Sequence, residues 1–380
     1  MATLHSINAL RVIAEYMVVR LHVFAGEVGM DMFVRDLMSF FFVLSGFVMM
    51  HAHHGSSFAT LEQKKEFWFA RWKKIYPSYI LNASFYIPVL CIIAFDMNNN
   101  CVYKLYCPLM QVFFLNSWAG CGVRHTINVV SWYIATLSWI WFAFPFIHGV
   151  IMKVTFEKHT WIKMLCINII SVIMILPFHE YETFTLCTLP ILRLGEFVIG
   201  CGISFALKQQ EFESMDFYKW LPLICSVTYL VVVYTVLALP HGMEWLCLHE
   251  EMQGSECRMW QTSEWVEASP PCFVAWDKYF NKHALVWAAI IHTIASAEKC
   301  NDLGVLMTAL NHDIFKTLSQ YSISLYLGHD SVKHALIGIT DFLGWSHFWH
   351  DDTILLAIYL LCYVLHLITQ RITCNLFKPV

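Results

Sequence analysis

Ten long apolar segments follow one another along the chain, and they constrain its fold more than any other feature. They run near residues 7–24, 33–52, 76–95, 129–152, 161–178, 186–206, 219–239, 283–297, 316–338 and 353–373. Each approaches the ~20 residues that a helix needs to cross a bilayer, and 283–297 is the shortest. The sequence therefore predicts an all-α fold, a polytopic transmembrane bundle of about ten membrane-spanning helices.

The composition supports this fold class. Hydrophobic residues make up 58% of the 380 residues and charged residues 14%, whereas soluble domains carry about 25% charged residues. No polar stretch is long enough to form a separate catalytic domain, so we expect one integral membrane domain over residues 1–380, with outer loops near 96–128 and 240–282. The net charge of −4 gives no reason to expect a nucleic-acid partner. The expected partner is the lipid bilayer.

Basic residues predict the orientation, because loops rich in Lys and Arg stay in the cytoplasm. The loop after the second segment carries Lys64, Lys65, Arg71, Lys73 and Lys74. We therefore expect a multi-pass protein with both termini in the cytoplasm and the two long loops on the other side. The charge pattern leaves open whether the membrane is the plasma membrane or an endomembrane.

Six cysteines fall in the two long loops: Cys101, Cys107, Cys121, Cys247, Cys257 and Cys272. Disulfides persist in oxidising compartments, so we expect some of the six to be paired. A zinc site is disfavoured because the chain has no Cys-x-x-Cys spacing. His51, His53 and His54 crowd the end of the second segment, but no matching cysteine or carboxylate spacing accompanies them, and no metal site is expected.

The first apolar segment carries three ionisable groups on or near one helical face. A helix turns about 100° per residue, so His22 returns to within roughly 20° of Arg11, about 16 Å further along the axis. Glu15 lies close to this face, whereas Arg20 points the opposite way. Ionisable groups in a membrane helix usually face a cavity or the bundle interior. The face therefore predicts a site with a fixed cation, a carboxylate and an imidazole that can take a proton near neutral pH.

Six motifs occur in one order along the chain. The first three are Arg11-x(10)-His22, Phe40-Phe-Phe-Val-Leu-Ser45-Gly46-Phe47 and Phe69-Ala-Arg71-Trp-Lys-Lys74-Ile-Tyr-Pro77. The last three are Trp132 placed 13 residues before Pro145, Arg193-Leu-Gly-Glu196-Phe197-(x)2-Gly200 and Ser322-Ile-Ser-Leu-Tyr326-Leu-Gly-His329. Together they resemble the signature of the acyltransferase 3 family of integral membrane acyltransferases, over most of the chain.

The resemblance implies an O-acyltransferase. Such an enzyme takes an acyl group, commonly acetyl, from an acyl-CoA on the cytoplasmic side. It transfers that group to a hydroxyl, often of a glycan, toward the other side. Acyl-CoA would be a co-substrate, and no permanently bound cofactor is expected. The resemblance implies that His22 is the general base or a transient acyl carrier, with Arg11 and Glu15 as its catalytic neighbours.

Two further groups of residues are candidates for substrate contact. Arg71, Lys73 and Lys74 lie where the donor's phosphates would arrive, and the alternative is that they only anchor the cytoplasmic loop. The candidates for the acceptor site or cavity are Trp132, Arg193, Glu196, His329 and Asp330. Alternatively, Arg193 and Glu196 form a buried ion pair, Trp132 is an interfacial aromatic, and His329 and Asp330 join a structural network. We interpret Ser45 and Gly46 as helix-packing residues.

The chain departs from the family pattern at two positions. Lys74 stands where the family has a second arginine, so the charge is kept but bidentate geometry is lost. Leu137 stands at the position of the family's glutamate in the fourth helix. Glu15 and Glu196 are the candidates to replace that carboxylate, and altered or lost activity is the alternative.

Two other functions compete with acyl transfer. Charged groups within helices also mark the ion or proton pathways of transporters, but the chain shows no inverted repeat and no matching pair of broken segments. Leu137 keeps open a non-catalytic relative that retains the fold. The residues also leave open whether transfer is direct or passes through an acyl-histidine.

Overall fold

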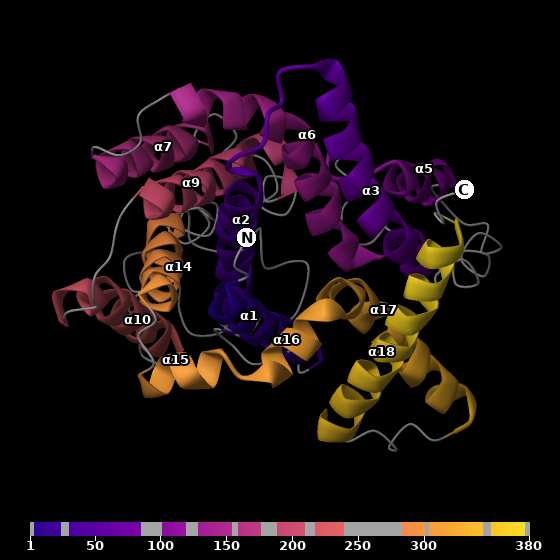
Figure 1. The fold of residues 1–380 in the computed structure, drawn as a ribbon. Coiled ribbons are helices and arrows are strands. Elements are labelled where there is room, and N and C mark those ends of the chain that lie inside the picture. Colours follow the sequence, from indigo (N-terminus) through magenta and orange to yellow (C-terminus); the bar gives the residue numbers. More distant parts are fainter. Residues whose placement is uncertain are drawn as a thin grey trace, which may run out of the picture.

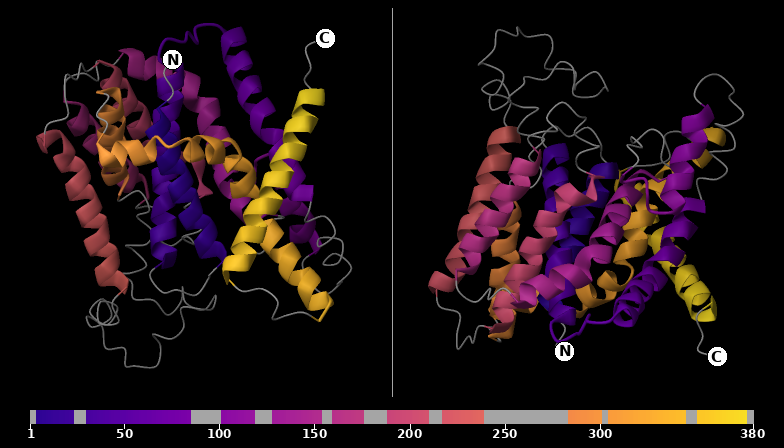
Figure 2. Two further views of the ribbon diagram at one scale, coloured as in Figure 1. Left: turned by 60° about the horizontal axis from the view of Figure 1, so that its bottom comes forward. Right: turned by 90° about the horizontal axis from the view of Figure 1, so that it is seen from above.

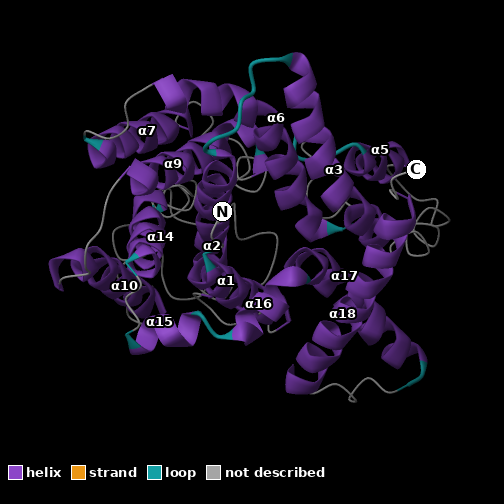
Figure 3. Ribbon diagram, in the orientation of Figure 1, coloured by secondary structure: helices purple, strands orange, loops and turns teal. Residues whose placement is uncertain are grey.

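Helices are the only regular elements among the residues that the structure describes (Figure 3). The structure is a computed structural model and describes residues 4–23, 30–84, 101–118, 128–153, 159–175, 188–209, 217–238, 283–300, 304–344 and 351–376. The longer helices are α1 (His5–Val23), α2 (Met30–His53), α3 (Leu61–Ser84), α6 (Trp132–Lys153), α7 (Thr160–Ile175), α9 (Pro190–Gln209), α10 (Phe217–Ala238), α14 (Ala284–Lys299), α17 (Ser322–Phe342) and α18 (Asp351–Leu376). The shorter ones are α5 (Cys101–Val112), the 3₁₀ helix η2 (Val129–Ser131), α15 (Val305–Leu310) and α16 (Asp313–Gln320).

Each predicted apolar segment overlaps one of the longer helices, although segment 316–338 also includes the end of α16 and residues 85–95 of the third segment lie outside the described residues. The boundaries differ most at α3, which begins at Leu61 rather than near residue 76, so that it includes the basic residues of the expected loop. Helix α5 lies in the region predicted as an outer loop. It is too short to cross a bilayer and is attached to α3, where the Tyr79 hydroxyl donates to the Gln111 carbonyl at 2.8 Å.

Four of the described helices are long and apolar enough to cross a membrane: Asp36–His53, Trp132–Lys153, Pro190–Gln209 and Thr353–Cys374. Thr160–Ile175 and Trp220–Val231 are apolar but shorter. The predicted count of about ten spans is therefore not confirmed. The sequence of α1 explains part of the difference, because Arg11, Glu15, Arg20 and His22 lower the hydropathy of a helix whose buried face lies inside the bundle.

Helices α1 and α2 lie in the middle of the bundle (Figure 1). Helices α7, α9, α10 and α14 lie on one side of them, whereas α3, α5 and α6 lie on the other, with α17 and α18 beside α3. The two views in Figure 2 place the start of α1, the start of α3 and the end of α18 on the same side of the bundle. This arrangement agrees with termini on one side of the membrane.

The closest helix contact joins α2 to α9 through two glycines. A Cβ atom added at Gly46 would lie 1.9 Å from the Phe197 carbonyl oxygen, and one added at Gly200 would lie 1.9 Å from the Val43 carbonyl oxygen. Small residues allow helix backbones to approach in this way inside a membrane. The interpretation of Gly46 as a packing residue is confirmed.

Charged side chains bind the free backbone groups at several helix ends. Glu298 at the end of α14 accepts the backbone N–H groups of His5 (2.6 Å) and Ser6 (3.0 Å) at the start of α1. Lys208 donates to the His51 carbonyl at 3.0 Å, and Lys299 donates to the Leu207 carbonyl at 2.9 Å. The first helical N–H groups and the last carbonyls have no partner within a helix, so these contacts tie neighbouring helix ends together.

The α2–α9 contact generates a stability prediction. Gly46→Ala should destabilise the protein by about 1–3 kcal/mol or more, because the new methyl group meets backbone atoms that cannot rotate away. Thermal unfolding of the purified protein in lipid nanodiscs measures the loss. Gly149→Ala is the matched control on α6, since a Cβ there meets no atom within 4 Å, and it should leave stability unchanged or slightly raised. Equal stability of the two variants would contradict the contact.

Candidate active site

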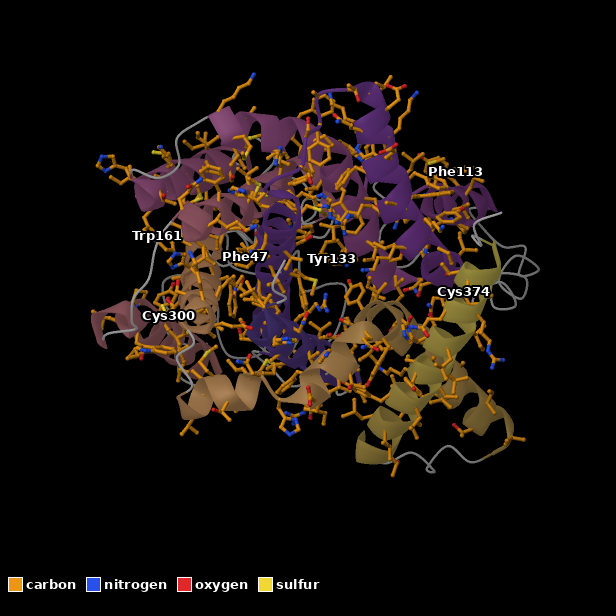
Figure 4. The ribbon with its side chains drawn as sticks, viewed as in Figure 1. Phe47, Phe113, Tyr133, Trp161, Cys300 and Cys374 are labelled. Carbon is orange, nitrogen blue, oxygen red and sulfur yellow. The ribbon has the colours of Figure 1, made fainter. Side chains whose placement is uncertain are left out.

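A cavity of about 230 Å³ lies between α1, α2, α3, α6 and α17. It brings together four residues that the sequence predicted for the site: Arg11, Glu15, Arg71 and Lys74. Helices α2 and α6 supply most of its apolar wall, and Figure 4 shows one of these residues, Tyr133, in the middle of the bundle. The other predicted cation, Lys73, is not among the residues of the cavity wall.

Glu15 is the only acidic residue among the described residues of the cavity wall. Its side chain is buried, and Oε2 accepts a hydrogen bond from the Ser322 hydroxyl at 2.6 Å. Oε1 has no hydrogen-bond partner among the described residues. A buried carboxylate oxygen without a partner is costly, so Oε1 is available to a ligand or to water in the cavity.

Leu137 lies in the wall of the same cavity. It is the position at which the sequence departs from the expected glutamate. Of the two candidate replacements, Glu15 lines this cavity and Glu196 does not. The cavity thus contains a carboxylate on α1 although the residue on α6 is apolar.

Arg11 lies one helical turn before Glu15. Its Nη2 donates to the Asn8 amide oxygen at 3.3 Å and to the Ser319 carbonyl at 3.2 Å, while Nε has no partner among the described residues. With Arg71 and Lys74, Arg11 gives the cavity wall three cationic side chains against one carboxylate. The cavity is therefore suited to an anionic group.

Arg71 is held by His53 at the end of α2. Its Nη2 donates to His53 Nε2 at 2.7 Å, so that the N–H of His53 is on Nδ1, which lies 3.2 Å from the Ser56 hydroxyl. Just beyond α2, burial lowers the pKa of His54, and the charge of Lys208 lowers it further. Within the described part of the chain, no three His, Cys, Asp or Glu side chains lie close enough to hold a metal ion.

His22 lies at the other end of α1 and is paired with His329 of α17. The distance from His22 Nδ1 to His329 Nε2 is 2.6 Å, and His329 Nδ1 lies 3.2 Å from the Leu325 carbonyl oxygen. A carbonyl can only accept, so neutral His329 has its proton on Nδ1 and a lone pair on Nε2. His22 therefore donates from Nδ1 and carries its own lone pair on Nε2. This is the arrangement in which one side chain sets the tautomer of a general base.

Tyr326 lies between the cavity and the histidine pair. It is part of the cavity wall, and its ring centroid is 6.0 Å from that of His329 and 5.4 Å from that of Tyr133. Its hydroxyl donates to the Val130 carbonyl at 2.8 Å. Tyr326 is therefore the residue of the cavity wall that also neighbours the histidine pair.

Arg193 and Glu196 form a buried ion pair outside the cavity wall. Arg193 Nη1 lies 3.0 and 3.1 Å from the two carboxylate oxygens of Glu196. The Ser39 hydroxyl donates to Glu196 as well, and the Arg193 guanidinium lies 5.1 Å from the Phe42 ring centroid and 6.0 Å from that of Trp132. The ion-pair alternative is confirmed, and the group joins α2, α6 and α9.

The remaining candidate for the acceptor site, Asp330, follows His329 in the sequence. Asp330 Oδ1 is 3.5 Å from His334 Nδ1, and neither is among the residues of the cavity wall. Lys333 donates to the His22 carbonyl at the end of α1. Lys333 thereby ties α17 to the helix that carries His22.

The predicted disulfides lie outside the described residues. The structure describes neither the side chains of Cys101 and Cys107 nor any part of Cys121, Cys247, Cys257 and Cys272.

Sequence reasoning missed Ser322 and Tyr326 as site residues. They precede His329 by seven and three residues, which places all three on one face of a helix. That spacing was the available signal. Tyr133 and Ser319 had no comparable signal, because an aromatic ring and a backbone carbonyl do not stand out in a membrane sequence.

Comparison with known families gives one match. Residues 4–369 match the model of the acyltransferase 3 family, described as an acyltransferase domain. No curated protein and no solved structure matches the chain.

The Arg193–Glu196 pair generates a prediction that separates support from substrate contact. Glu196→Gln should destabilise the protein by about 3–5 kcal/mol, because Arg193 would remain charged and buried without its carboxylate. The double variant Arg193→Met with Glu196→Leu should recover much of that loss. Chemical unfolding in nanodiscs measures both variants. If Glu196→Gln kept wild-type stability but lost activity, the pair would be a substrate contact instead.

Proposed function

We propose, because the chain belongs to the acyltransferase 3 family of membrane acyltransferases, that it transfers an acyl group from an acyl-CoA to a hydroxyl. The donor would enter from the cytoplasm, and the acceptor, a glycan hydroxyl, would approach from the outer or lumenal side. The acyl group that the family resemblance implies is acetyl. The observation that carries the proposal is the His22–His329 pair at one end of α1 and the cationic cavity at the other.

The donor end of this proposal rests on charge. Arg11, Arg71 and Lys74 line one cavity, and the basic residues of α3 favour the cytoplasmic side. The phosphates of CoA are anions that Arg and Lys bind well. Lys73, next to Lys74 in the sequence, would add to the positive potential at this end.

The acceptor end rests on the tautomer of His22. His22 Nε2 would remove the proton from the acceptor hydroxyl while the hydroxyl oxygen attacks the thioester carbonyl carbon. The carbon–sulfur bond then breaks, and the thiolate of CoA takes the proton from His22. In the alternative route Nε2 attacks the thioester first and forms an acyl-imidazole, which the hydroxyl then cleaves. Both routes need the lone pair on Nε2 that the His329 contact favours.

The length of α1 fits transfer across the membrane. His22 lies roughly 10 Å beyond Glu15 along the helix axis. Donor phosphates bound near Arg71 and Lys74 would therefore lie at the opposite end of α1 from the thioester carbonyl that reacts at His22. The flexible arm of CoA, which ends in the thiol, would extend past Tyr326 to reach His22.

Glu15 would supply the carboxylate of the donor cavity. It would orient Arg11 and the entering donor, and it would do so from α1 because Leu137 of α6 offers no carboxylate. Glu196 is excluded from this role by its bonds to Arg193 and Ser39.

The central test is the activity of His22→Ala. Purified protein in nanodiscs is given acetyl-CoA and a panel of hydroxyl acceptors, and both hydrolysis and transfer are measured. The variant should lose about 10²–10⁴-fold in rate, which is the usual contribution of a general base. His366→Ala is the matched control, since His366 is also half-buried, contacts Ser324 at 3.4 Å and has its ring centroid 6.1 Å from that of Tyr321. Retention of more than a tenth of the wild-type rate by folded His22→Ala would end the proposal.

The same assays separate the two competing functions. No turnover by the wild type would favour the non-catalytic alternative, and acceptor-independent flux across sealed vesicles would favour the transporter.

The role of Glu15 is tested by moving the carboxylate. Glu15→Ala should lower kcat/KM by about 10²-fold, as expected when positioning is lost. Adding Leu137→Glu to that variant should restore part of the activity, because both positions line one cavity. Leu137→Glu alone is the control for the effect of a new buried carboxylate. Full activity of Glu15→Ala, or no rescue by a folded double variant, would contradict the assignment.

A further inference from the structure

A second and larger cavity lies beside the first. It is a groove of about 690 Å³ between α3, α6 and the turn that follows α5. Eight of its twelve lining residues are aromatic, and these include Trp68, Trp72, Trp139 and Trp141. The volume lies within the range of about 300–1,000 Å³ that is typical of ligand sites, whereas the cationic cavity is smaller than this range. The proposed transfer of an acetyl group gives this groove no role.

The groove opens toward the surface of the bundle. Three of its aromatic side chains are at least half exposed: Phe69 at 56%, Phe113 at 61% and Phe142 at 50%. Phe142 belongs to the spanning helix α6, and Figure 4 shows Phe113 at the edge of the bundle, next to α5. An apolar groove on the side of a spanning helix faces the acyl chains of the bilayer.

The groove and the cationic cavity share a wall. Arg71, Ile75 and Trp141 line both of them. The indole N–H of Trp141 is buried and has no hydrogen-bond partner among the described residues. A molecule that occupied both spaces would therefore place a polar atom near Trp141 and an apolar part among the rings.

Charge indicates what the apolar part is attached to. The only charged residues among the described lining of the groove are Lys65 and Arg71, both on α3. Lys65 lies four residues after α3 begins at Leu61, and Arg71 lies in the wall that the groove shares with the cationic cavity. Two cations beside an apolar aromatic groove complement a molecule with an anionic head and a hydrocarbon chain.

We propose that the groove binds the fatty acyl chain of the acyl donor, so that the protein uses a long-chain acyl-CoA. The phosphates would lie near Lys65, Arg71 and Lys74 and the chain among the rings, and the thioester would leave Trp141 and pass Tyr326 to reach His22 for transfer. This inference rests on the proposed function, because it assigns the acyl chain to that reaction's donor. A donor with a long chain would reach the groove laterally from the cytoplasmic leaflet. Its chain would leave its contacts with lipid and pack against the aromatic rings.

The test is a chain-length series with the full-length protein in phosphatidylcholine nanodiscs. Binding and transfer are measured for acetyl-, octanoyl- and palmitoyl-CoA, each below its micelle concentration. We expect KM and the dissociation constant to fall at least tenfold from acetyl- to palmitoyl-CoA, with a smaller change in kcat. Equal constants across the series would overturn the proposal. So would a nanodisc phospholipid in the groove that palmitoyl-CoA does not displace.

Variants of the groove separate it from the remaining apolar surface. Ser138→Phe places a ring in the groove and should raise KM for palmitoyl-CoA at least tenfold while leaving that for acetyl-CoA unchanged. Phe142→Ala removes the ring stacked on Trp68 at 4.4 Å and should also weaken long chains selectively, which keeps the test valid if Ser138→Phe fails to fold. Phe146→Ala is the matched control, because Phe146 lies one turn further along α6, is 54% exposed and does not line the groove.

The outcomes for the groove and for the reaction are distinct. Acetyl transfer without dependence on chain length or on groove variants would refute the groove and leave the proposed function standing. Groove-dependent binding of palmitoyl-CoA without transfer to any hydroxyl would support the groove and refute the reaction.

Discussion

The contact of α2 with α9 is the constraint on which the rest of the structure depends. Gly46 and Gly200 allow the two backbones to touch, and the Arg193–Glu196 pair, with Ser39, bonds the same helices in the interior. Hydrophobic burial does not drive association between helices that already lie in lipid, so backbone contact and polar bonds supply the specificity. Helix α2 in this position provides one wall of the cationic cavity, and its last residue, His53, binds Arg71.

From this frame, α1 connects two chemically different regions. Its first half, with Arg11 and Glu15, faces a small cavity that carries three cations and one carboxylate. Its last turn holds His22 against His329. Helix α17 binds α1 at both places, through Ser322 on Glu15 and through Lys333 on the His22 carbonyl. One helix pair therefore sets both the position of the carboxylate and the tautomer of the histidine, which ties the proposed donor and acceptor ends to one rigid unit.

The replacement of a carboxylate on α6 by Leu137 does not leave the cavity without one, because Glu15 faces the same space from α1. An apolar residue at position 137 also suits its surroundings. The neighbouring face of α6 lines the aromatic groove, and Trp141, one turn further on, contacts both spaces. A cavity for anions and a groove for hydrocarbon meet at this turn of α6, and that junction is the basis for assigning a fatty acyl-CoA as the donor.

The sequence by itself determined the helices, the family and the residues able to carry the chemistry. Apolar segment length indicated the helices, the spacing of Arg11, Glu15 and His22 indicated one functional face, and the spacing of Arg193 and Glu196 indicated their ion pair. Only the tertiary structure decided that His22 meets His329, that Glu15 meets Ser322 and shares a cavity with Leu137, and that rings from α3, α6 and the turn after α5 form a groove. The reason is physical. Periodicity along a helix reports which residues share a face, whereas contacts between residues about 300 positions apart depend on the tilt, rotation and separation of whole helices.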